Sequence, residues 1–160
     1  MFQHIRKLPP AHRIVLRMDG SLTVSRYWET VFEPEERPFE DVVEQLRETL
    51  KQSVQMHLPS GGEHGSFLSS GIDSTAISAI MRYFEPIKTF SVGFAGRMNE
   101  TDISRDTAAM LGTEHYEKVI GKEEYFNSLP KAVWNLDEPL ADPSAIALYH
   151  VAALAREHVA

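Results

Sequence analysis

The segment HGSFLSSGIDST, residues 64–75, joins a short apolar run to the start of a helical pattern. Residues 64–69 read as a strand, and from Ser74 to Phe84 apolar side chains recur at spacings of three and four. Two serines, a glycine and a further Ser-Thr pair lie at the junction. A strand that passes through such a turn into a helix is the first unit of an α/β fold.

Strands and helices continue to alternate after this unit. Gly112 and the Asp142-Pro143 pair mark a helix stop and a helix start. We predict strands at 88–94 and 114–120, and helices from Pro38, at 99–111, at 122–136 with a break at Pro130, and from Asp142 onward. This spacing is typical of βαβ units, so the fold class is α/β, a parallel sheet with helices on both faces.

Residues 1–32 have a different pattern. Asp19-Gly20 lies between two β-rich runs, 12–18 and 21–27, which predicts a short β-hairpin. A two-stranded hairpin alone is marginally stable in water. We therefore interpret 1–32 as an appendage or the tail of another domain, and 33–160 as the α/β domain.

Composition narrows the function. The 160 residues carry 16 basic and 23 acidic side chains, for a net charge of −7, which argues against nucleic-acid binding. No apolar run approaches the roughly 18 residues of a membrane span, and no secretory signal follows Arg6 and Lys7, so we expect a cytoplasmic protein without membrane contact. The absence of cysteine excludes disulfides, Cys-ligated metals and a cysteine nucleophile in this sequence.

The loop after the first strand has the composition of an anion site. Ligands of open parallel sheets bind beyond the carboxyl ends of the strands, and here hydroxyls and helix-start N–H groups converge. Asp73 would repel a phosphate unless a cation lay between them, and Mg²⁺ prefers one or two carboxylates plus phosphate oxygens. The Walker and dinucleotide motifs are absent. The loop thus predicts a pyrophosphate or triphosphate with Mg²⁺ on Asp73; an ordinary Ser/Gly-rich turn is the alternative.

The stretch Ser69–Ser74 (SSGIDS) resembles the SGGxDS loop of the ATP pyrophosphatases. Within them it is most similar to the synthetase domain of glutamine-hydrolysing asparagine synthetases. Further segments share the resemblance: IRKLPPAH (5–12), RYW (26–28), TFSVGF (89–94), LGTEH (111–115) and DEPLADPSAI (137–146).

The resemblance implies a fold of the adenine nucleotide alpha-hydrolase type and a function. ATP would activate the aspartate side chain as an adenylate, and ammonia derived from glutamine would then form asparagine. By position, the pyrophosphate would be held by Ser69, Ser70, Gly71, Asp73 and Ser74, with Asp73 on Mg²⁺. Phe67 and Val92 would meet the adenosine through backbone groups.

Other residues are weaker candidates, and none is assigned as catalytic. Glu138 could lie near the substrate amino group or a second metal. Glu100 follows the second strand and could contact the ribose, although a charge at a helix N-terminus is the simpler interpretation.

Three features depart from the family pattern. Ser70 stands where the motif usually has glycine. No cysteine is present for glutamine hydrolysis, and the S-G-E-G-x-D-E loop does not follow before Ala160. We therefore expect a fragment, with 1–32 the tail of a glutaminase domain and 33–160 the first half of the synthetase domain. Such a fragment would bind ATP and Mg²⁺ without turnover, and its exposed apolar surface would favour a homodimer.

Two rival functions stay open. β-Lactam synthetases, macrolactam cyclases and polysaccharide-linked amidotransferases share this domain and act on other carboxylates. A catalytically silent nucleotide-binding module would bind ATP without any reaction.

Overall fold

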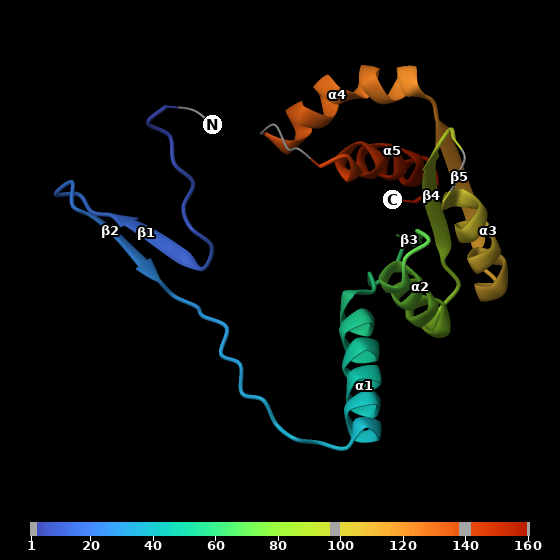
Figure 1. Cartoon of the computed structure of the whole chain (residues 1–160), viewed down its shortest axis with the longest axis horizontal. Coiled ribbons are helices and arrows are strands. Elements are labelled where there is room, and N and C mark those ends of the chain that lie inside the picture. The colour runs from blue at the N-terminus through green and yellow to red at the C-terminus, as the bar shows by residue number, and fades with distance from the viewer. Residues whose placement is uncertain (1–2, 97–99, 138–141, 160) are drawn as a thin grey trace. The chain divides into compact units, whose positions relative to one another are not determined.

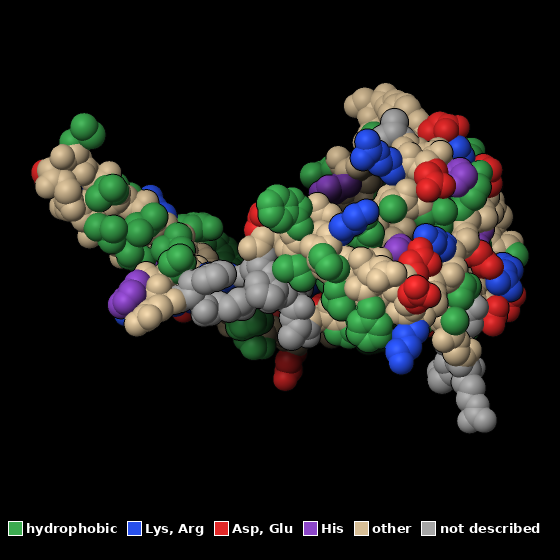
Figure 2. Space-filling model, turned by 90° about the horizontal axis from the view of Figure 1, so that it is seen from above, with side chains coloured by type: hydrophobic (Ala, Val, Ile, Leu, Met, Phe, Trp, Pro, Cys, Tyr) green, Lys and Arg blue, Asp and Glu red, His purple; other side chains and the backbone are tan. Residues whose placement is uncertain are grey.

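The structure, a computed structural model, describes residues 3–96, 100–137 and 142–159 and divides into two units, 1–39 and 40–160. In the first unit, β1 (His12–Leu16) and β2 (Leu22–Arg26) form the predicted antiparallel hairpin. Gly20 occupies the turn with a φ of +82°. Ile14 faces Val24 and Leu16 faces Leu22 across the ladder, and all four side chains are exposed. Apolar side chains are accordingly visible on this unit in Figure 2.

The second unit begins with the second residue of α1 (Phe39–His57) and continues as an alternating series. Its further elements are β3 (Gly65–Phe67), α2 (Ile72–Phe84), β4 (Lys88–Phe94), α3 (Glu100–Leu111), β5 (Glu114–Ile120), α4 (Lys122–Leu136) and α5 (Ser144–Arg156). The three strands form a parallel sheet in the order β3-β4-β5. Figure 1 shows α3 beside one face of β4 and α5 beside the other. The predicted α/β class is confirmed.

The core lies where α5 packs on the two longer strands. Phe90 of β4 packs with Val151 and Ala155 of α5. Ile120, at the end of β5, packs with Ala132 of α4 and Ile146 of α5. The helix α4 contacts α5 more extensively than it contacts the strands, and α5 packs on both β4 and β5.

The helix α4 differs from the prediction. It runs unbroken through Pro130, so the predicted break there is wrong. A proline in a helix removes one backbone hydrogen bond and strains the preceding turn. Here Ser128 and Ala132, on either side of Pro130, are both buried, and burial of this face favours a continuous helix despite the missing hydrogen bond.

Other boundaries shift only slightly. The strand β3 is shorter than the predicted 64–69, and α2 starts at Ile72 rather than Ser74. The helix α5 begins at Ser144 with Pro143 as its N-cap residue, two residues after the predicted start at Asp142, whose carboxylate accepts hydrogen bonds from the Ser144 N–H at 2.9 Å and the Ser144 hydroxyl at 2.7 Å. Among the described residues, no helix has the length and apolar character needed to cross a membrane.

Candidate functional site

The loop between β3 and α2 is fixed at both ends by buried contacts. The Leu68 N–H donates to the Phe90 carbonyl at 2.8 Å, and the Ser91 hydroxyl donates to the Leu68 carbonyl. On the helix side, the fully buried Ser78 donates to the Ser66 hydroxyl at 3.0 Å. Leu68, just after β3, is thus bonded to β4, and α2 is bonded to β3, so the loop starts and ends at defined positions.

Within the loop, the Ser74 hydroxyl is the centre of a small hydrogen-bond network. It accepts from the Ser69 N–H at 3.1 Å, lies 2.7 Å from the Ser69 hydroxyl, and donates to the Gly71 carbonyl at 3.1 Å. The Gly71 N–H in turn donates to the Ser69 hydroxyl at 3.2 Å. Three of the five predicted pyrophosphate ligands, Ser69, Gly71 and Ser74, are therefore brought together.

Ser70 and Asp73, the other two, are exposed and take no part in this network. Ser70 is not among the described non-glycine residues with positive φ, so its backbone conformation needs no glycine. Asp73 stands in the first turn of α2, where N–H groups lack helical acceptors and the helix dipole favours anions. In the described part of the chain its carboxylate makes no hydrogen bond or ion pair.

These residues fit a magnesium ion that is shared with a phosphate. The described residues contain no group of three or more His, Asp or Glu side chains able to hold a metal by themselves. Mg²⁺ usually takes only one or two carboxylates and fills its octahedron with phosphate oxygens and water. The exposed Asp73 carboxylate beside the hydroxyl loop meets that requirement.

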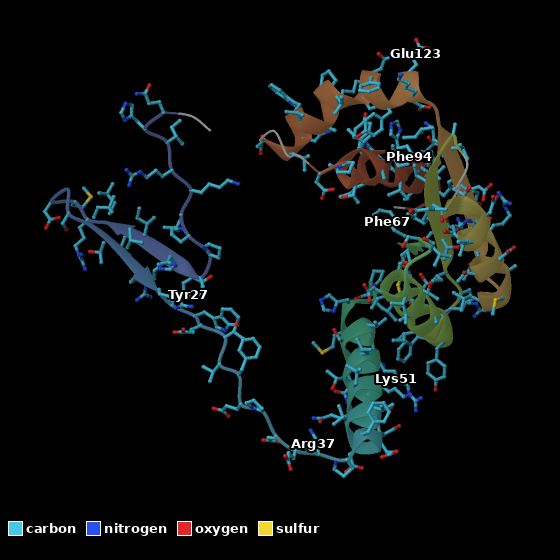
Figure 3. The ribbon with its side chains drawn as sticks, in the orientation of Figure 1. Tyr27, Arg37, Lys51, Phe67, Phe94 and Glu123 are labelled. Carbon is cyan, nitrogen blue, oxygen red and sulfur yellow. The ribbon has the colours of Figure 1, made fainter. Side chains whose placement is uncertain are left out.

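A cavity of about 370 Å³ adjoins the loop at the carboxyl ends of β3 and β4, within the size range of small-molecule sites. Four predicted residues line it: Phe67, Ser69, Ser74 and Val92. Phe67 lies at the end of β3 on the side that faces α5 (Figure 3). Ser70, Gly71 and Asp73 are not in its lining.

Of the residues on the other walls, only Glu100 was named from sequence, as a weaker candidate for contact with the ribose. Glu100 and Ser104 enter from the first two turns of α3, and the α5 wall consists of Ser144, Ala147, Leu148 and Val151. The signal for Glu100 was its position just after the second strand. The α5 residues follow an ordinary amphipathic pattern and reach the cavity only through the packing of α5 on β4. Glu138, the remaining predicted residue, lies outside the described residues.

A larger groove of about 720 Å³ runs between α4 and α5. Its lining is mostly apolar, with Ala132, Leu148 and Tyr149 among its residues. It contains none of the loop residues and none of the strand ends. The smaller cavity is the candidate site because it alone, of these two, joins the predicted anion-binding loop to the strand ends.

Comparisons with known proteins agree with the motifs. A model of the asparagine synthase family matches residues 45–160. An asparagine synthetase [glutamine-hydrolyzing] 1 of Bacillus subtilis is 44% identical over 158 residues, which cover 98% of this chain and 25% of that protein. A putative asparagine synthetase of Mycobacterium tuberculosis is 40% identical over 72% of the chain, and one of Methanocaldococcus jannaschii is 30% identical over 99%. The chain thus spans about a quarter of the length of the Bacillus relative.

Proposed function

Because the chain belongs to the asparagine synthase family, as its motifs indicated, we propose that the β3–α2 loop and the adjoining cavity bind ATP for asparagine synthesis. The observation that carries the proposal is the meeting of Ser69, Ser74, Phe67 and Val92 at one cavity. The loop would bind the charged phosphates of ATP, and the apolar pocket beside it would bind the adenosine.

Each predicted residue has a role in this proposal. Ser69, Ser70, Gly71 and Ser74 hold the β- and γ-phosphates through hydroxyl and N–H donors, and Asp73 holds Mg²⁺. Bound Mg²⁺ would supply neutralisation of the charge on the leaving pyrophosphate. Phe67 and Val92, at the strand ends, present backbone groups to the adenosine.

The reaction proposed for the whole protein has two steps. The side-chain carboxylate of aspartate attacks the α-phosphorus of ATP, so pyrophosphate leaves and an aspartyl adenylate forms. Ammonia from glutamine then attacks the acyl carbon, AMP leaves, and the amide of asparagine is complete. The 160 residues contain no cysteine, so a cysteine-dependent release of that ammonia would require residues other than these.

The domain assignment is part of the same proposal. Residues 1–32 correspond to the end of a glutaminase domain and 33–160 to the first part of the synthetase domain. The match to the Bacillus relative across 98% of the chain, hairpin included, supports this assignment. ATP binding without turnover by this chain, and a homodimer, stay predictions.

The test is a thermal-unfolding titration of the chain with ATP, with and without Mg²⁺. A ligand that binds only the folded state at a hundredfold excess over its Kd stabilises by about 2.7 kcal/mol. We expect a Mg²⁺-dependent rise in Tm that Asp73→Asn removes. The matched control is Asp106→Asn, an exposed carboxylate of α3 outside the cavity.

The controls make the outcome decisive. No rise for a folded chain, or an equal rise in the Asp73→Asn variant, would contradict the proposed role of Asp73. A rise that Asp106→Asn also removes would indicate a general charge effect.

A further inference from the structure

The described lining of the cavity next to the loop includes one ionisable residue, Glu100, which is exposed. Glu100 is the first residue of α3, which follows β4, whereas Ser69 and Ser74 belong to the connection that follows β3. The acidic group and the phosphate-binding hydroxyls therefore enter the same cavity from two different strand–helix connections.

The hydroxyls around Glu100 already have partners within the protein. Ser104 donates to the Glu100 backbone carbonyl at 3.0 Å, Ser91 donates to the Leu68 carbonyl, and Ser69 and Ser74 contact each other at 2.7 Å. The Glu100 carboxylate, by contrast, makes no hydrogen bond or ion pair within residues 3–96, 100–137 and 142–159. Among the polar side chains of the described lining, Glu100 is the one without a partner in those residues.

The chemistry of a carboxylate limits what it can recognise. An ionised carboxylate only accepts hydrogen bonds, and it repels phosphate. Its natural partner on a nucleotide is a pair of adjacent hydroxyls, because two O–H donors match its two oxygens. In the proposed site, the backbone of Phe67 and Val92 and the apolar side chains of α5 contact the base. The sugar is therefore the part of the nucleotide that Glu100 can bind.

We propose that Glu100 accepts hydrogen bonds from the 2′- and 3′-hydroxyls of the bound nucleotide and makes the site selective for ribonucleotides. This inference rests on the proposed ATP site and adds a specificity-determining residue to it. It also replaces the simpler interpretation of Glu100 as a charge that only complements the α3 dipole.

The experiment compares the affinities of ATP, 2′-deoxyATP and 3′-deoxyATP, each with Mg²⁺, for the 160-residue chain by calorimetric titration. Loss of one charge-assisted hydrogen bond corresponds to about a tenfold loss of affinity, so the unaltered chain should prefer ATP to 2′-deoxyATP by that factor. The Glu100→Ala variant should bind ATP more weakly and 2′-deoxyATP about as before, because only ATP loses a hydrogen bond. Its preference for ATP should therefore fall below about twofold. Glu100→Gln keeps one acceptor oxygen and should keep part of the preference.

The matched control is Asp102→Ala, which removes a carboxylate from the same first turn of α3. Asp102 pairs with Arg105 at 3.1 Å and does not line the cavity, so this variant should retain the full preference for ATP. It corrects for any effect of helix-terminal charge on folding or on the local potential.

The possible outcomes separate this inference from the proposed function. Equal affinity of the unaltered chain for ATP and 2′-deoxyATP would overturn the role of Glu100 and leave the ATP site standing. The same holds if Glu100→Ala weakens all three nucleotides equally, or if it alters discrimination between ATP and ITP instead. A folded chain that binds no nucleotide would overturn both.

Discussion

Ser70 is the position at which this loop departs from the glycine-rich pattern of its family. Its φ is not positive, so the serine is accommodated without backbone strain. We therefore expect Ser70→Gly to give no relief of strain and to destabilise the fold by about 0.5–1 kcal/mol, because glycine loses more backbone entropy on folding.

Urea unfolding and ATP titration of Ser70→Gly measure the two consequences together. A small loss of stability with an ATP affinity within about threefold of the parent would show that the side chain does not obstruct the phosphates. A gain of tenfold or more in affinity would instead show that the serine Cβ hinders the approach of the phosphates.

At the level of residues, the sequence indicated the loop but not the whole cavity. Ser69, Asp73 and Ser74 could be selected because hydroxyls and a carboxylate between a strand and a helix have few structural uses in combination. The contact of Ser69 with Ser74 follows from local chain geometry, so it could be predicted from the sequence. Ala147 and Leu148 could not, because only the packing of α5 on β4 brings them beside the loop.

Among the secondary structure elements, the short strand β3 depends on one glycine. Gly65 pairs with Lys88 of β4, and a Cβ on Gly65 would overlap the Lys88 carbonyl oxygen and lie 2.7 Å from Cε2 of Phe90. Because the first obstacle is backbone, it cannot move aside as a flexible side chain could. We expect Gly65→Ala to destabilise the fold by about 1–3 kcal/mol, as overpacking of a core does.

Gly61→Ala is the matched control for this prediction. Gly61 lies in the segment before β3, and a Cβ there has nothing within 4 Å. Chemical denaturation of both variants should show a clear shift of the midpoint for Gly65→Ala and little for Gly61→Ala. Equal midpoints would mean that β3 can separate from β4 without cost, and that the loop is less firmly anchored than its contacts suggest.

The elements themselves were largely predictable. Continuous β-rich runs predicted β4 and β5 at their observed bounds. Gly112, between α3 and β5, has the positive φ expected at a helix stop. The error at Pro130 arose because local rules describe an isolated helix. The burial of Ser128 and Ala132 is a tertiary effect that compensates for the hydrogen bond lost at Pro130. The sequence alone indicates the loss but not the compensation.

For the second unit as a whole, we expect the buried His150 and the half-buried His115 to set the first response to acid. His150 of α5 contacts the Ser128 hydroxyl at 2.7 Å, and its side chain is 6% exposed. Burial lowers the pKa of His150 below its usual 6.5; the cation of Lys118 lowers it further, while Glu124 opposes the change. Burial likewise lowers the pKa of His115 on β5, although Glu117 raises it.

A lowered histidine pKa means that the unfolded chain binds the proton more readily than the folded one. Stability is therefore at its full value above about pH 6.5 and declines as the pH falls from there through the folded-state pKa values. Each proton taken up on unfolding contributes a slope of at most about 1.4 kcal/mol per pH unit. Carboxylates such as Glu124, whose ordinary value is 4.5 and whose pKa Lys118 lowers, act only at lower pH.

Urea unfolding between pH 7.5 and 5 therefore isolates the histidines. His150→Gln keeps a group able to hydrogen-bond Ser128 but cannot titrate, so it should flatten the decline, whereas His4→Gln at an exposed position of the first unit should not. If His150→Gln unfolds with the parent's pH dependence, the contact between Ser128 and His150 persists in the protonated state. The acid response would then come from groups other than His150, such as His115, and the α4–α5 contact through His150 would be insensitive to pH.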